Sequence, residues 1–209
     1  MPNLKHQLTR MNSMITLMEG RVHWSEDEIL KYLKLNNIPF NKVSYIGSGE
    51  FGNAYWLGNG KVLKITTSES EYEIASQILN KKLPGLVTFY FAATIGNNFR
   101  YALVMDEVDT DSSIEDDFSR VEMILSTQGL GISYEGLTYF NEDDYDQSEG
   151  ELDTKIEKFM WELRNIFKSC HEIGIRIPDI NYGNLGYNNA GVLTAFDLHD
   201  RAKTPNSRW

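Results

Sequence analysis

The stretch that decides the fold is the glycine-rich loop Gly47-Ser48-Gly49-Glu50-Phe51-Gly52, which has the spacing G-x-G-x-x-G. The residues that follow, Asn53-Ala54-Tyr55-Trp56-Leu57, favour a strand and lead into the tight turn Gly58-Asn59-Gly60. We therefore predict that the loop joins two antiparallel strands. Glycines in such a loop let backbone N–H groups approach phosphate oxygens, because no Cβ stands in the way.

The G-x-G-x-x-G spacing alone is a weak signal. In dinucleotide-binding folds it opens a helix whose N-terminus holds the pyrophosphate, and the strand context here excludes that interpretation. In a second interpretation the glycines only build a tight hairpin. In a third, the loop is a flap over nucleotide phosphates, and residues farther along the chain must decide between these two.

Strand and helix signals alternate around the loop. The predicted elements of the N-terminal half are strands near 43–45, 54–57 and 62–65, a helix over 68–79, and strands over 86–95 and 101–108. This order of three strands, a helix and two strands predicts an antiparallel sheet. Ahead of it, the capping box at residues 25–28 predicts a short helix that stops before Pro39.

The C-terminal half has mainly helical signals followed by short strands. Helices are predicted over 112–125 and 152–170, a long loop over 134–151, and short strands over 174–177, 185–187 and 191–196. Polar residues between such strands are common positions for catalytic side chains.

Lys64 lies in the apolar run Val62-Leu63-Lys64-Ile65, where an ammonium without a partner is costly. We expect an anionic partner on the next helix, and both Glu71 and Glu73 are candidates. A Lys–Glu pair directed at the α- and β-phosphates is the arrangement that phosphate transfer needs. The alternative is an ordinary surface ion pair.

The order of glycine loop, strand lysine and helix glutamate resembles the N-terminal lobe of protein kinases. Residues 101–108 resemble the strand that leads to the kinase hinge, and 177–184 keep the Asp-x-x-x-x-Asn spacing of the catalytic loop. Ala195-Phe196-Asp197-Leu198 is similar to the strand end that carries the magnesium aspartate. The resemblance covers about residues 43–200 and is greatest to small bacteriophage-encoded serine/threonine kinases, although some small-molecule kinases share it.

The resemblance implies an α+β, bilobal protein-kinase-like fold. Residues 1–40 would form an N-terminal extension, 41–108 an N-lobe built on an antiparallel sheet, and 109–209 a reduced, mainly helical C-lobe. It also implies ATP and Mg²⁺ as cofactors. The implied nucleotide-binding residues are Gly47, Ser48, Gly49, Glu50, Phe51, Gly52, Ala54, Lys64, Glu71, the gatekeeper Met105, and the hinge residues Asp106 and Val108.

By the same resemblance, Asp179 accepts or orients the proton of the substrate hydroxyl, and Asn184 and Asp197 hold Mg²⁺. Lys64 and Asn181 complete the implied catalytic set. A different interpretation of residues 179–184 is a polar turn held by Asx hydrogen bonds. His171 and His199 have no metal-site spacing partner, and we expect both to be surface or packing residues.

The chain also departs from the kinase pattern. Pro178 replaces the catalytic-loop arginine, so regulation through an activation-loop phosphate is not expected. Asn181 stands where protein kinases often have lysine, which removes one positive charge from the transferring phosphoryl group. His199 takes the position of the last glycine in the D-F-G-like triplet, and ten residues follow it. We therefore expect a partner or a second copy of the chain to complete the reduced C-lobe, or peptide docking to differ.

Composition narrows the partners of this 209-residue chain. Its formal charge of −10 disfavours nucleic acid and anionic lipid, and no apolar run is long enough to span a membrane. A single cysteine and no signal-peptide pattern favour the cytoplasm, that of the host if a phage encodes the protein. We expect a protein substrate, either a host protein or the chain itself. A small-molecule phosphotransferase of the aminoglycoside or choline type and a nucleotide-binding pseudokinase are the alternatives.

Overall fold

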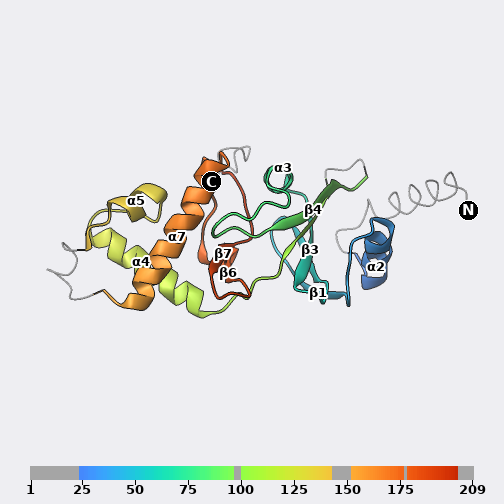
Figure 1. The fold of residues 1–209 in the computed structure, drawn as a ribbon, viewed down its shortest axis with the longest axis horizontal. Helices are drawn as coiled ribbons and strands as arrows, with labels where there is room; N and C mark the ends of the chain where they lie inside the picture. Colours follow the sequence, from blue (N-terminus) through green and yellow to red (C-terminus); the bar gives the residue numbers. More distant parts are fainter. Residues whose placement is uncertain (1–23, 97–99, 143–151, 177, 202–209) are drawn as a thin grey trace, which may run out of the picture. The chain divides into compact units, whose positions relative to one another are not determined.

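The computed structural model describes residues 24–96, 100–142, 152–176 and 178–201 (Figure 1). It has the expected α+β class, with one five-stranded antiparallel sheet, a two-stranded sheet and several helices. The described residues form two compact units. Unit 1 contains those up to Asn80 together with Phe89–Glu107, and unit 2 contains Lys81–Thr88 together with those from Val108 onward.

Unit 1 is built on the five-stranded sheet. Its strands, in spatial order, are β1 (Ser44–Ser48), β2 (Gly52–Trp56), β3 (Lys61–Thr66), β5 (Tyr101–Asp106) and β4 (Phe89–Thr94), and helix α3 (Glu69–Gln77) connects β3 to β4. The predicted order of three strands, a helix and two strands is confirmed. In the β2–β3 turn, Gly58 and Gly60 have φ values of 70° and 72°, which explains the need for glycine at both positions.

Helix α2 (Glu26–Leu35) packs on one face of this sheet. The predicted capping box is present, since Ser25 accepts from the Glu28 N–H and the Glu28 carboxylate accepts from the Ser25 N–H. The helix contributes Ile29, Tyr32 and Leu33 to the main core of unit 1. They share this core with Leu57, which follows β2, and with the strand residues Tyr55, Leu63, Ile65, Ala102 and Val104.

The glycine at position 52 is required by the packing of β2 on β3. A Cβ there would overlap the carbonyl oxygen of Ile65 and lie 2.9 Å from the Cα of Thr66, whereas a Cβ at Gly49 would meet nothing within 4 Å. We expect Gly52→Ala to lower the free energy of unfolding by about 1–3 kcal/mol, as overpacking does. Gly49→Ala is the matched control and should change it by less than about 0.5 kcal/mol. Urea unfolding checks both values, and equal stability of the two variants would contradict this packing.

Unit 2 combines helices with a small sheet. Its elements are α4 (Ser113–Thr127), α5 (Tyr134–Tyr139), α7 (Thr154–Glu172), the 3₁₀ turn η1 (Tyr182–Asn184), β6 (Leu185–Tyr187) and β7 (Leu193–Ala195). The predicted helices α4 and α7 are confirmed, and they lie side by side in Figure 1. The two strands pair antiparallel. None of the helices in the described residues is both long and apolar enough to cross a membrane.

Two sequence predictions in unit 2 are wrong. The loop predicted over 134–151 begins with helix α5, which starts because the Ser133 hydroxyl accepts from the Gly136 N–H at 2.9 Å; residues 143–151 lie outside the described part. Residues 174–176 form no strand, and Ile177 lies outside the described part. Gly174 has φ 82°, and the N–H groups of Gly174 and Ile175 cap the carbonyls of His171 and Cys170 at the end of α7.

The strand predicted over 86–95 starts only at Phe89. The residues before it pair with β7 instead, since the Val87 N–H donates to the Ala195 carbonyl at 3.0 Å and the Ala195 N–H donates to the Gly85 carbonyl at 2.8 Å. This pairing explains why Lys81–Thr88 belong to unit 2 although β4 belongs to unit 1. A second contact holds the same segment, because the Ser169 hydroxyl on α7 donates to the Pro84 carbonyl.

Candidate active site

The glycine-rich loop joins β1 and β2, as predicted: Gly47 and Ser48 end β1, Gly52 begins β2, and Gly49–Phe51 form the turn between them. A hydrogen bond of 2.9 Å from the Gly49 N–H to the Gly52 carbonyl closes the turn, and Ser48 and Glu50 are exposed. Packing explains the glycine at position 52, but a Cβ at Gly47 or Gly49 would meet no atom within 4 Å. The hairpin interpretation therefore accounts for one glycine of the motif and leaves the other two to a role outside packing.

Lys64 and Glu71 form a buried ion pair within unit 1. The Lys64 Nζ lies 2.8 Å from the Glu71 Oε1, and the two side chains are 13% and 0% exposed. Glu71 is therefore the partner, while Glu73 is exposed on the same helix. The alternative of a surface ion pair is wrong. Glu71 also sits in the first turn of α3, where the helix dipole favours a carboxylate.

Three of the predicted nucleotide-binding residues share one face of the sheet. In the strand register, Ala54 lies opposite Lys64, Lys64 opposite Leu103, and Met105 two residues farther along β5. Because successive side chains of a strand alternate between faces, Ala54, Lys64 and Met105 lie on the face opposite the Leu63 and Ile65 side chains that pack with α2. Strand pairing alone thus brings these positions together.

The end of β5, predicted to act as the hinge, is held by its side chains. The Tyr90 hydroxyl donates to the Asp106 Oδ1 at 2.8 Å, and the Trp56 Nε1–H donates to the Glu107 Oε2 at 2.9 Å. Lys61 lies 3.9 Å from Asp106, and burial lowers the pKa of Lys61 while Asp106 partly opposes that shift. The Glu107 N–H donates to the Gly60 carbonyl. The Asp106 and Glu107 side chains are therefore engaged by residues of unit 1, and the hinge role of this segment stays a prediction.

Val108, which is predicted to bind the nucleotide, is the first residue of unit 2 after β5. The next residue, Asp109, is held by backbone hydrogen bonds. Asp109 exchanges two backbone hydrogen bonds of 2.8 Å with Tyr187 on β6. Val108 itself contacts β6 closely, since a Cβ at Gly186 would lie 2.9 Å from two of its side-chain atoms. The Val108 side chain thus leaves no room for a Cβ at position 186, which explains the glycine there.

Unit 2 holds Asp179, Asn181 and Asn184 in one local network. The Asp179 N–H donates to the His199 carbonyl at 3.2 Å, and the Asn184 Nδ2 donates to the Asp179 carbonyl at 2.8 Å. The Asn181 Oδ1 accepts from the Gly183 N–H at 2.9 Å, which caps η1. The Asx-turn interpretation is therefore correct for Asn181. The Asp179 carboxylate, on a side chain 23% exposed, takes no part in that cap and has contacts of its own, described below.

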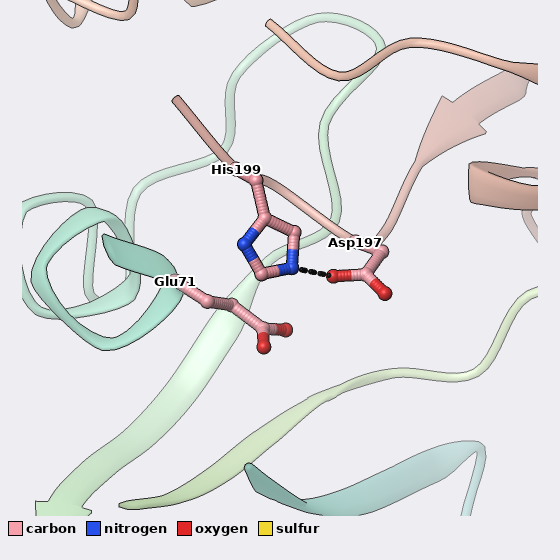
Figure 2. A group of neighbouring side chains, drawn as sticks. All are labelled: Glu71, Asp197 and His199. Carbon is pink, nitrogen blue, oxygen red and sulfur yellow. Dashed lines mark ion pairs between the residues drawn. The ribbon is translucent and has the colours of Figure 1, made fainter. Parts of the chain in front are cut away.

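Asp197 follows β7 and pairs with His199. The His199 Nε2 lies 2.6 Å from the Asp197 Oδ1, and the histidine side chain is 8% exposed. Figure 2 shows the two side chains directed toward each other. His199 is therefore a packing residue, one of the two placements expected from the sequence. The two residues are only two positions apart in the sequence, and the bend at Asp197 after β7 brings their side chains together.

The residues predicted to hold Mg²⁺ have suitable donors. The segments that carry Asn184 and Asp197 are joined by a backbone hydrogen bond of 3.1 Å from the Phe196 N–H to the Asn184 carbonyl. The Asn184 Nδ2 donates to the Asp179 carbonyl, so the Asn184 Oδ1 takes no part in this hydrogen bond. One amide oxygen and one carboxylate are the oxygen donors that a hard divalent cation prefers. The donor types of Asn184 and Asp197 thus suit such a cation, and Mg²⁺ binding stays a prediction.

Arg201 is a site residue that sequence reasoning missed. Its Nη2 contacts the Asp179 Oδ1, and its side chain is 61% exposed. The Asn181 Nδ2 donates to the same carboxylate oxygen at 3.2 Å. The alternation Asp197-x-His199-x-Arg201 could have drawn attention to Arg201, although no local pattern names Asp179 as its partner.

Comparison with known proteins adds no assignment. A scan of protein-family models finds no match to this chain, and a search of curated proteins finds none either. A functional assignment must therefore come from the residues of the chain itself.

Proposed function

We propose that this chain is an ATP- and Mg²⁺-dependent phosphotransferase of the protein-kinase type. The observation that carries the proposal is the buried Lys64–Glu71 pair on a sheet whose first two strands flank the glycine-rich loop. Burying an ammonium and a carboxylate together costs desolvation energy, and replacement by apolar residues is often neutral or stabilising. A role in binding phosphate gives a reason to keep the pair.

In this proposal unit 1 is the N-lobe of a kinase-like fold and unit 2 a reduced C-lobe. The antiparallel sheet with α3 between β3 and β4 supports the first assignment. Lys64 binds the α- and β-phosphates, Glu71 orients Lys64, and the loop glycines give the phosphates access to backbone N–H groups. Met105, Asp106 and Val108 form the adenine side of the nucleotide site.

Unit 2 provides the residues for chemistry. An acceptor hydroxyl oxygen forms a bond to the γ-phosphorus, the bond from that phosphorus to the β,γ-bridging oxygen breaks, and ADP leaves. The Asp179 carboxylate takes the hydroxyl proton as the new bond forms. Asn184 and Asp197 would hold Mg²⁺, which neutralises phosphate charge when it is bound. His199 pairs with one oxygen of Asp197 and orients this ligand.

The acceptor in this proposal is a serine or threonine hydroxyl of a protein, either a host protein or this chain. This choice follows the resemblance to small bacteriophage kinases. A second copy of the chain is a candidate to complete the acceptor platform. Transfer to a small molecule or binding without transfer are the competing outcomes.

The test is transfer of label from γ-labelled ATP. Purified chain is incubated with Mg²⁺ and the labelled nucleotide, alone, with a bacterial lysate, and with an aminoglycoside or choline, beside Asp179→Ala and Asp197→Ala. We expect label on a polypeptide with the wild type and at least about 10²-fold less with either variant. Equal background in all three proteins would refute the proposal. Label on an aminoglycoside or choline, but on no polypeptide, would replace the protein acceptor by a small molecule.

A further inference from the structure

We propose that Arg201 is the residue that stabilises the transferring phosphoryl group, through the guanidinium N–H groups that its contact with Asp179 leaves available. This inference rests on the proposed function and adds a group to it that the sequence pattern did not supply. Its basis is the contact between the guanidinium and the carboxylate that serves as the base.

The two oxygens of the Asp179 carboxylate have different surroundings. Both Arg201 and the Asn181 Nδ2 contact Oδ1. Within the described residues, Oδ2 accepts no hydrogen bond from a protein group. One oxygen is thus held in position, and the other is open to a substrate hydroxyl.

Arg201 itself has donors to spare. A guanidinium carries five N–H donors in a rigid plane and stays charged at all relevant pH values. The side chain is 61% exposed, and its contact with Asp179 is made by Nη2. The remaining N–H groups can bind a second anion next to the carboxylate, and a phosphoryl group matches their geometry.

Phosphoryl transfer requires such a cation. Negative charge is spread over the three equatorial oxygens of the γ-phosphoryl group as it moves from ADP to the acceptor oxygen. Neither Pro178 nor Asn181, beside the base, is charged, and Arg201 is the cation that forms an ion pair with Asp179 in the described part of the chain. During the step Arg201 neither gains nor loses a proton, because the hydroxyl proton passes to Asp179.

A simpler explanation is that Arg201 and Asp179 form an ordinary exposed ion pair. Such pairs contribute about 0–1 kcal/mol to stability and nothing to catalysis. The chain offers a matched control, since the Arg120 Nη1 lies 3.2 Å from the Asp153 Oδ2 and the two side chains are 48% and 44% exposed. Arg120→Ala therefore removes a pair of the same kind elsewhere in unit 2.

The first test is steady-state kinetics of Arg201→Ala, Arg201→Lys and Arg120→Ala. We expect Arg201→Ala to lower kcat by about 10²–10³, the loss typical of one stabilising donor, with the KM for ATP within about threefold of wild type. Free guanidinium ion should restore part of the kcat of Arg201→Ala, and Arg201→Lys should retain an intermediate rate. Arg120→Ala should equal the wild type. An unchanged kcat in Arg201→Ala, or a kcat loss that Arg120→Ala shares, would overturn the inference.

The second test needs no turnover. Calorimetry measures the affinity of the chain for ADP and Mg²⁺, with and without aluminium fluoride. The fluoride mimics the planar phosphoryl group in the transition state. We expect Arg201→Ala to bind ADP within about twofold of wild type and to lose at least about 10²-fold of the extra affinity that the fluoride gives. If wild type and Arg201→Ala bound the ADP–aluminium fluoride complex equally well, the role of Arg201 would be refuted and the proposed function would stand. A wild type that binds neither ADP nor its fluoride complex would refute the proposed function as well.

Discussion

Asp179→Asn is expected to lower kcat for phosphoryl transfer by about 10²–10⁴, the usual contribution of a general base. Asparagine has nearly the same shape but cannot accept the hydroxyl proton. The contacts of Asp179 with Asn181 and Arg201 involve a half-buried side chain, so the fold should persist. Initial rates at saturating ATP measure the loss.

The control for this substitution is Asp116→Asn, at an exposed aspartate on α4 that takes no part in the proposed site. It should leave kcat unchanged. Calorimetric binding of ADP should be similar in wild type and Asp179→Asn, since the base does not hold the nucleotide. A variant that transfers phosphate at the wild-type rate would remove Asp179 from the mechanism.

Lys64→Met should lower the free energy of unfolding by about 3–5 kcal/mol, because it leaves the fully buried Glu71 without its cation. For a chain of this length each kcal/mol corresponds to about 2–4 °C in Tm, so we expect a shift of roughly 6–20 °C. The same variant should lose affinity for ATP. Urea unfolding and thermal melts measure stability, and calorimetry measures the nucleotide affinity.

A double substitution separates the two consequences. Lys64→Met with Glu71→Leu replaces the buried pair by apolar side chains and should recover most of the lost stability. Its ATP affinity should stay low, because the phosphate contact is missing. Arg120→Ala, which breaks an exposed pair, should cost less than about 1 kcal/mol. A Lys64→Met protein as stable as Arg120→Ala would show that the Lys64–Glu71 pair is not buried in solution.

The sheet of unit 1 could be predicted because its signals are local. Runs of apolar and β-forming residues mark the strands, and the Gly58-Asn59-Gly60 turn sets the pairing of β2 with β3. That pairing then determines which residues share the face with Lys64. The choice between Glu71 and Glu73 could not be made from helical spacing alone, because it depends on the face of α3 that packs against the sheet.

The features that sequence reasoning missed depend on contacts between distant residues or on helix ends. Arg201 meets Asp179 across 22 positions of the chain, and no periodicity reports such a contact. Helix α5 is six residues long, too short for a periodic pattern, and its N-cap Ser133 was the available signal. The strand predicted from Gly174 was wrong because the glycine ends α7 instead.

The most direct test of the account compares two positions of the label. Wild-type chain is incubated with Mg²⁺ and either γ-labelled or α-labelled ATP, with Asp197→Asn as the control for the metal site. The account predicts that label reaches a polypeptide hydroxyl from the γ position, that none is transferred from the α position, and that Asp197→Asn transfers at least about 10²-fold less. Transfer of the α label, or no transfer of either label by the wild type, would contradict it.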